Sequence, residues 1–175
     1  GQIIHINRKG GEFSSSVMRS NFADSLLTVT DVAFHHEMSD LVLSCYGNGE
    51  IRLYHTNYMM PIKTWNLGCL GKRIKEIKWI ESRSSCFSVI DEQDCFYLWD
   101  LLEDDTQPVL GKDLNDFGGI TYSKASKEES NVPFAYFKRD SKSVEIHLFG
   151  KDWIRKSEKE FKKFSKLIKN YLISF

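Results

Sequence analysis

The fold is decided by residues 29–65, which read VTDVAFHHEMSDLVLSCYGNGEIRLYHTNYMMPIKTW. The next stretch of the chain repeats this pattern at a fixed offset of 45 residues. The apolar positions that correspond are Val32 with Ile77, Phe34 with Trp79, Leu53 with Leu98 and Tyr54 with Trp99. The polar turn Gly47-Asn48-Gly49 falls on Glu92-Gln93-Asp94 at the same offset. The chain is therefore predicted to contain at least two copies of one structural unit.

Each unit holds four short segments with the composition of β-strands. The first unit has them at residues 27–35, 41–46, 51–55 and 61–65, and the second at 74–80, 86–90, 95–100 and 108–110. The run 41–46 is almost wholly apolar, which is typical of a strand buried on both faces. Four short strands in a unit of about 40–45 residues are typical of a β-propeller blade. The sequence thus predicts an all-β protein built from propeller blades.

Two incomplete units flank the complete ones. Residues 1–7 and 13–19 have the pattern of the third and outer strands of a blade, so we expect the chain to begin in mid-blade as a fragment of a longer polypeptide. A last unit has strand patterns at 119–123, 134–137 and 144–149, with no visible fourth strand. The predicted domain over residues 1–150 is a partial ring of about two full and two partial blades.

From Lys151 the apolar period changes from that of a strand to that of a helix. Phe161, Phe164, Ile168 and Tyr171 recur at helical spacing, and lysines fill the other faces. Residues 151–175 are therefore predicted to form a basic amphipathic helix. One interpretation packs its apolar stripe, with Trp153, on the propeller; the other makes it a membrane-surface or calmodulin-binding segment. We favour packing, because the stripe is a continuous apolar face that requires cover.

Composition excludes several classes of function. The 175 residues are 41% hydrophobic, 27% charged and 13% aromatic, with a formal net charge of zero. Residues 1–150 carry 16 Lys and Arg against 21 Asp and Glu, whereas residues 151–175 carry 8 against 3. An acidic body gives no basic face for nucleic acid, and no apolar run is long enough to insert into a membrane. The four cysteines show no metal-binding spacing, which indicates a reducing, intracellular compartment.

The sequence contains no pattern of catalytic residues, and we expect no catalytic site, metal or cofactor. The glycine pairs Gly10-Gly11 and Gly118-Gly119 do not belong to a phosphate-binding motif. No serine lies in the Gly-x-Ser-x-Gly motif of a nucleophile elbow. The acidic run Glu103-Asp104-Asp105 is interpreted as a solvated turn. The aromatic residues predicted to form the structural core are Phe34, Tyr54, Trp79, Trp99 and Trp153.

Three stretches together resemble the C-terminal part of the dynein intermediate chains, a family with WD repeats. Arg73–Asp100, which ends in Leu-Trp-Asp, resembles the family's penultimate blade, and Val29–Trp65 resembles the blade before it. Lys151-Asp152-Trp153 with its amphipathic run resembles the closing helix. Many WD repeats contain a buried His–Asp–Trp hydrogen-bond network, which is incomplete here: Tyr54-His55 stands where the next blade has Trp99-Asp100. We therefore expect apolar packing to hold the blades together. Ile80 in place of a proline and the long basic helix are more similar to the second cytoplasmic dynein.

The resemblance implies a non-catalytic motor subunit whose propeller binds the dynein heavy chain tail, beside other intermediate and light chains. It also implies a place in the cytoplasm and cytoskeleton, and in the cilium or at its base, with retrograde intraflagellar transport as the process. The lysines expected to contact an acidic partner are Lys159, Lys162, Lys163 and Lys166. The alternative is a generic WD-repeat scaffold of another assembly, such as a ubiquitin ligase or a coat.

Overall fold

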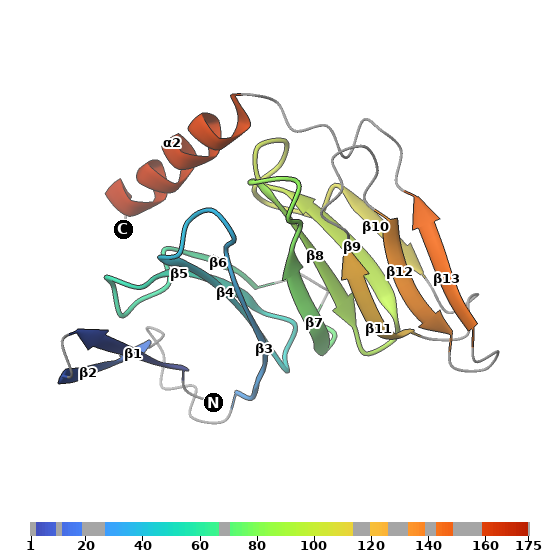
Figure 1. The fold of residues 1–175 in the computed structure, drawn as a ribbon, viewed down its shortest axis with the longest axis horizontal. Helices are drawn as coiled ribbons and strands as arrows, with labels where there is room; N and C mark the ends of the chain where they lie inside the picture. The colour runs from blue at the N-terminus through green and yellow to red at the C-terminus, as the bar shows by residue number, and fades with distance from the viewer. Residues whose placement is uncertain are drawn as a thin grey trace.

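The structure of the chain is a computed structural model that describes residues 3–9, 12–18, 27–66, 71–113, 120–125, 133–138, 143–148 and 159–174. The described residues form antiparallel sheets and one C-terminal helix, which lies across one end of the sheets (Figure 1). The bounds of the elements follow the repeat that the sequence predicts.

Each of the two repeats forms a four-stranded antiparallel sheet. The first sheet has the order β3 (Val29–Phe34), β4 (Leu41–Tyr46), β5 (Ile51–His55) and β6 (Lys63–Trp65). The second has the order β7 (Ile74–Trp79), β8 (Cys86–Asp91), β9 (Cys95–Asp100) and β10 (Leu110–Asp113). The expectation of two full blades is confirmed.

The offset of 45 residues holds for strand register as well as for sequence. In the first sheet Phe34 lies opposite Val42, and Val42 lies opposite Tyr54. In the second sheet the same places are occupied by a cross-strand row of three aromatic rings, Trp79, Phe87 and Trp99. Because every member of one row corresponds to a member of the other, the two sheets are structural repeats.

The tight turns between the second and third strands also correspond. Gly49 has φ +83° and its counterpart Asp94 has φ +60°, so both turns use the left-handed region. Gly49 meets a second requirement, because a Cβ there would lie 2.7 Å from the carbonyl oxygen of Lys72. The glycine therefore permits both the turn and the close approach of the chain that leads into β7.

Incomplete sheets flank the two repeats in the described part of the chain. The hairpin of β1 (Ile3–Lys9) and β2 (Glu12–Met18) precedes them. The sheet of β11 (Ile120–Ala125), β12 (Pro133–Lys138) and β13 (Ser143–Leu148) follows them. The described architecture is a partial β-propeller, as the sequence predicts.

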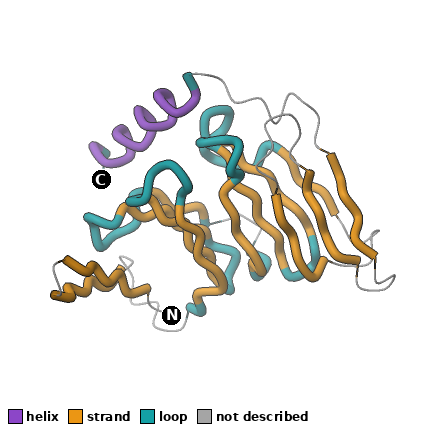
Figure 2. Tube along the Cα trace, in the orientation of Figure 1, coloured by secondary structure: helices purple, strands orange, loops and turns teal. Residues whose placement is uncertain are grey.

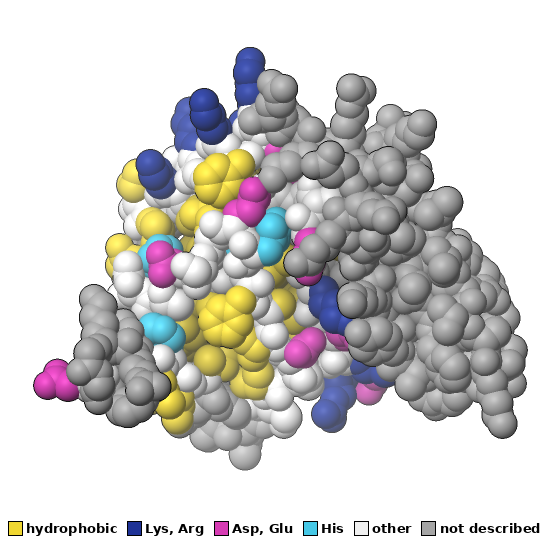
Figure 3. Space-filling view, in the orientation of Figure 1, with side chains coloured by type: hydrophobic (Ala, Val, Ile, Leu, Met, Phe, Trp, Pro, Cys, Tyr) yellow, Lys and Arg dark blue, Asp and Glu magenta, His cyan; other side chains and the backbone are white. Residues whose placement is uncertain are grey.

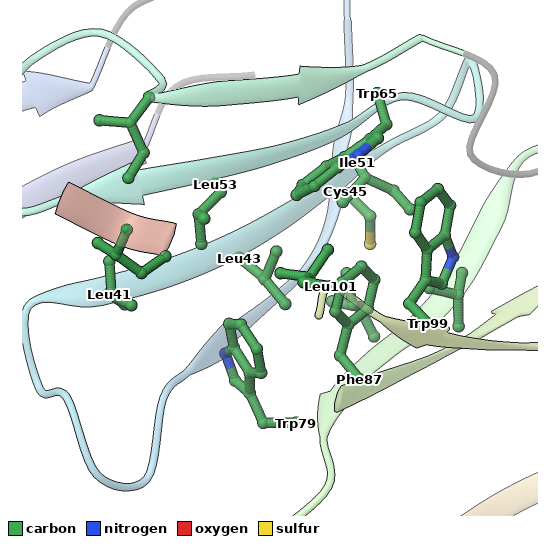
Figure 4. Packing of buried hydrophobic residues seen from close by; sticks show 14 of the residues in the cluster. Leu41, Leu43, Cys45, Ile51, Leu53, Trp65, Trp79, Phe87, Trp99 and Leu101 are labelled. Carbon is green, nitrogen blue, oxygen red and sulfur yellow. The ribbon is translucent and has the colours of Figure 1, made fainter. Parts of the chain in front are cut away.

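The main core lies between the two four-stranded sheets. Trp79, Phe87 and Trp99 project from the second sheet toward the side chains of Leu43 and Trp65 on the first (Figure 4). The rings of Phe87 and Trp99 stack with centroids 5.4 Å apart. Burial of these large aromatic rings, together with the aliphatic side chains of the same cluster, stabilises the pair of sheets.

Two hydrogen bonds join β3 to β7, the first strands of the two sheets. The backbone N–H of Ile77 donates to the Asp31 carboxylate at 3.0 Å, and Trp79 Nε1 donates to the carbonyl oxygen of Ala33 at 3.2 Å. Trp99 Nε1, in contrast, is buried and has no acceptor among the described residues. The indole that forms the polar network in many WD repeats therefore packs here as an apolar ring.

Phe34 is the one predicted core aromatic that the structure corrects. Its side chain is 64% exposed, whereas Tyr54, Trp79 and Trp99 are buried. The neighbouring first sheet covers Trp79. On the Phe34 face, the β1–β2 hairpin supplies Met18 and Ile3, which pack on Val42 and Tyr54 and leave Phe34 exposed. Periodicity predicts which face Phe34 shares with Val42 but not how far that face is covered. Trp153 lies outside the described residues.

Candidate functional site: the docked C-terminal helix

Helix α2 (Glu160–Ile173) is shorter than the predicted run, of which residues 151–158 lie outside the described part. It lies over the edge of the two four-stranded sheets where their loops gather (Figure 2). It contacts residues in three of these loops, β3–β4, β7–β8 and β9–β10. The helix therefore bridges two consecutive blades.

The apolar face of α2 is part of the main core. Phe164, Ile168 and Tyr171 are buried against the sheets. The ring of Phe164 stacks on His35 with centroids 5.3 Å apart and meets Trp79 edge-on at 6.0 Å. The interpretation that packs the helix on the propeller agrees with this arrangement, although Phe161, part of the predicted stripe, is 38% exposed.

His35 is held beneath Phe164 by three hydrogen bonds. Its Nδ1 accepts the backbone N–H groups of Glu37 and Met38, each at 3.0 Å, and its Nε2 lies 2.8 Å from the carbonyl oxygen of Ser84. Because Nδ1 accepts and a carbonyl can only accept, the ring is the neutral tautomer with its proton on Nε2. His35 therefore has a structural role, in which it ties the β3–β4 loop to the β7–β8 loop.

A buried polar group, which we call the Arg83 cluster, holds the first turn of α2. It consists of Arg83, Ser85, Asp100 and Glu160. Arg83 donates from Nε to Glu160 at 2.8 Å and from a terminal nitrogen to Asp100 at 2.7 Å. The Ser85 backbone N–H donates to Glu160 at 3.1 Å, and its hydroxyl donates to Asp100 at 2.8 Å. One guanidinium thus joins a carboxylate of the helix to a carboxylate of the second sheet.

The environment of Asp100 keeps its carboxylate ionised. Burial raises the pKa of this group, but hydrogen bonds from the Ser85 hydroxyl and the Leu102 N–H, together with the charge of Arg83, lower the pKa below its usual value. The cluster is therefore built around the ionised carboxylate of Asp100, and it depends on its single cation, Arg83.

Asp105 anchors the last turns of α2. Its carboxylate accepts the Tyr171 hydroxyl at 2.7 Å and lies 3.2 Å from Lys63 Nζ. Its carbonyl oxygen accepts the indole N–H of Trp65 at 2.7 Å. Burial, and then the neighbouring carboxylate, raise the pKa of Tyr171, so the tyrosine stays a donor. The acidic run is a turn, as interpreted, but Asp105 is only partly solvated, because it also contacts the first sheet and the helix.

Asp105→Ala is expected to destabilise the protein by about 1–3 kcal/mol, because it removes a charged acceptor from Tyr171 and Lys63. Hydrogen exchange should quicken in residues 168–173 before it does in the strands. Glu103→Ala is the matched control, because Glu103 is exposed in the same loop, and it should be within about 0.5 kcal/mol of wild type. Equal effects of the two substitutions in urea unfolding would contradict the anchoring role.

The outward face of α2 is basic. Lys162, Lys163, Lys166 and Lys169 are exposed, and Figure 3 shows lysine and arginine side chains projecting at the edge that the helix occupies. Three of the four lysines predicted to contact a partner are in α2, and the fourth, Lys159, directly precedes it. Lys169 is absent from that predicted set, although the helical period alone places it beside Lys166. The only acid of residues 159–174 is Glu160, which the Arg83 cluster buries.

The apolar face of α2 is already used by the fold. A helix that lies in a membrane surface or in a calmodulin groove contacts its partner through that face. Here Phe164, Ile168 and Tyr171 would first have to leave the core, so the docked helix offers a partner its lysines. In the part of the chain that the structure describes, no helix is long and apolar enough to span a membrane.

The described residues contain no group of three or more His, Cys, Asp or Glu side chains placed to hold a metal ion. Burial raises the pKa of the Cys45 thiol to about 12, and burial likewise raises that of Cys86. Both thiols are therefore protonated at neutral pH and act as small core side chains. Among the described residues, the exposed lysines of α2 form a surface that a partner can contact.

The sheets and the bridging helix define the class of protein as a WD-repeat β-propeller. Among solved structures, the chain superimposes on a variant of the propeller KlHsv2 whose loop 6CD is replaced by a Gly-Ser linker. The TM-score is 0.52 and the sequence identity 14%, and the match covers 83% of this chain and 57% of the other. At this identity the likeness shows the fold alone. No protein-family model matches the chain.

In sequence, the chain is similar to cytoplasmic dynein 2 intermediate chain 1. It is 27% identical to the mouse protein over 116 residues and 27% identical to the human protein over 75 residues. These matches cover 66% and 43% of this chain, but only 12% and 7% of the mouse and human proteins. The resemblance to the propeller of the dynein intermediate chains is confirmed, and the chain corresponds to a small part of those relatives' length.

Proposed function

We propose that the chain is part of a non-catalytic intermediate-chain subunit of a dynein motor, and that its propeller binds the tail of the dynein heavy chain. The similarity to the mouse and human dynein 2 intermediate chains carries this proposal. The propeller fold supports it, because blades and loops supply binding surfaces. The proposed partners are the heavy chain tail and the other intermediate and light chains of the complex.

The proposed process is retrograde intraflagellar transport, in the cytoplasm and cytoskeleton and at the cilium or its base. Both curated relatives reported above are subunits of dynein 2, which supports this motor over the other cytoplasmic dynein. The docked helix supports a binding role, because it presents exposed lysines on a scaffold that its buried contacts hold in place.

Affinity purification of the tagged full-length protein from its own cells tests the proposal. Mass spectrometry should identify a dynein heavy chain among the recovered proteins. Deletion of Asp152–Phe175 should lower both the melting temperature and the yield of heavy chain, because it removes the cover of the two blades and a proposed contact. Recovery of a ubiquitin-ligase core or coat subunits, with no dynein subunit, would favour the alternative scaffold and refute the proposal.

A further inference from the structure

Three lysines and an isoleucine form a single stripe on the side of α2 that faces away from the sheets. Lys162, Lys166, Lys169 and Ile173 are spaced by four, three and four residues, and all are exposed. At 100° per residue this stripe lies opposite Phe164, Ile168 and Tyr171, which are buried. The spacing is that of the contact positions of one helix against another, over a length of about 16 Å.

The charges on this stripe oppose the stability of the isolated protein. Lys162 and Lys166 are four residues apart and Lys166 and Lys169 three apart, so like charges are neighbours on the helix surface. Exposed helix faces usually alternate acids with bases, but Glu160 is buried in the Arg83 cluster and cannot compensate. Residues 159–174 carry no exposed acid that would offset this repulsion, and a local arrangement that costs stability in this way is typical of a functional surface.

The stripe is also fixed in orientation. The Arg83 cluster holds the first turn of α2, Phe164 holds its centre, and the hydrogen bond from Tyr171 to Asp105 holds its last turns. The helix therefore cannot rotate its lysines toward an acidic loop of its own chain without breaking buried contacts. A partner meets three positive charges in a preset row, which reduces the entropy that binding must overcome.

We propose that this stripe binds an acidic α-helix of another subunit, with carboxylates at matching spacing opposite Lys162, Lys166 and Lys169 and an apolar residue opposite Ile173. The inference deepens the proposed function and rests on it, because the partner helix is assigned to the dynein heavy chain tail. Charge complementarity selects the partner, and the 4-3-4 spacing matches the contact positions of a helix packed against another helix. Binding in an anionic membrane surface would also need the apolar face of α2, which the fold has buried.

The test compares three triple variants of the full-length protein, with all three lysines changed to Glu, Gln or Arg. Lys162→Glu/Lys166→Glu/Lys169→Glu should reduce heavy chain recovery at least about fivefold at physiological salt, and the Gln triple should reduce it less. The Arg triple should match wild type, because it keeps the charges. All three should melt within a few degrees of wild type, because exposed charges contribute little to stability.

A carbodiimide cross-linker, which joins an amine directly to a carboxylate, identifies the partner segment. Peptides containing Lys162, Lys166 or Lys169 should be cross-linked to acids of one subunit at helical spacing. Sedimentation with phosphatidylserine vesicles should leave the wild-type protein in solution, and vesicle binding that the Glu triple abolishes would overturn the inference. Equal heavy chain recovery by wild type and the Glu triple would also overturn it while the proposed function stands. Wild type that recovers no dynein subunit refutes both.

Discussion

Trp79→Ala is expected to lower the free energy of unfolding by about 3–5 kcal/mol. The indole is 6% exposed, packs on Phe87 and Phe164, and donates to the carbonyl oxygen of Ala33. Alanine would leave a cavity where two sheets and the helix meet, and it would remove the indole hydrogen bond to the Ala33 carbonyl. Chemical unfolding followed by tryptophan fluorescence and circular dichroism measures the loss.

Phe34→Ala is the matched control, because Phe34 occupies the same register position in the preceding blade. Phe34 is 64% exposed, so removal of its ring should change the free energy of unfolding by less than about 1 kcal/mol. Comparable losses at the two positions would mean that the Phe34 face is as deeply covered as the Trp79 face, contrary to the packing described above.

Arg83→Ala is expected to cost about 3–5 kcal/mol, because it leaves the carboxylates of Asp100 and Glu160 buried without their cation. The first turn of α2 should lose protection from hydrogen exchange before the sheets do. Arg73→Ala, at an exposed arginine that precedes β7, is the control and should be near neutral.

The loss should depend on pH in a defined direction. In the wild-type protein Arg83 helps to lower the pKa of Asp100, so this group contributes stability above the usual carboxyl pKa, and that stability is lost as the pH falls through the lowered value. In the Arg83→Ala variant the cation no longer offsets the cost of burying the ionised Asp100 carboxylate. Protonation of that carboxylate removes this cost. The difference between wild type and variant should therefore shrink toward acidic pH; a difference that grows would contradict the ionised state of Asp100.

Strand positions depend on local pattern, and the sequence therefore predicts them well. The alternation and the turn residues predict β4, β5 and β9 with the bounds that the structure shows. The prediction is less accurate for β10, which is expected at residues 108–110 and found at Leu110–Asp113. Pairing with β9 begins at Leu110 and continues to Asp113, beyond the end of the predicted segment.

The contacts that dock α2 could not be predicted, because they join distant parts of the chain. Glu160 is 77 residues from Arg83, and Tyr171 is 66 residues from Asp105. No local signal marks a carboxylate in an acidic loop as an acceptor for a helix that lies so far along the sequence. The exposure of Phe34 could not be predicted for a related reason. How much of its side chain is covered depends on residues of the neighbouring blade, which lie elsewhere in the sequence.

The proposal that the chain is part of a dynein intermediate chain is tested most directly by coexpression of the full-length protein with a dynein 2 heavy chain tail. The two should elute together from a size-exclusion column as one complex, and the triple lysine-to-glutamate variant should elute apart from the tail as salt is raised to levels that wild type withstands. Separate elution of the folded wild-type protein and the folded tail at low salt would contradict the assignment.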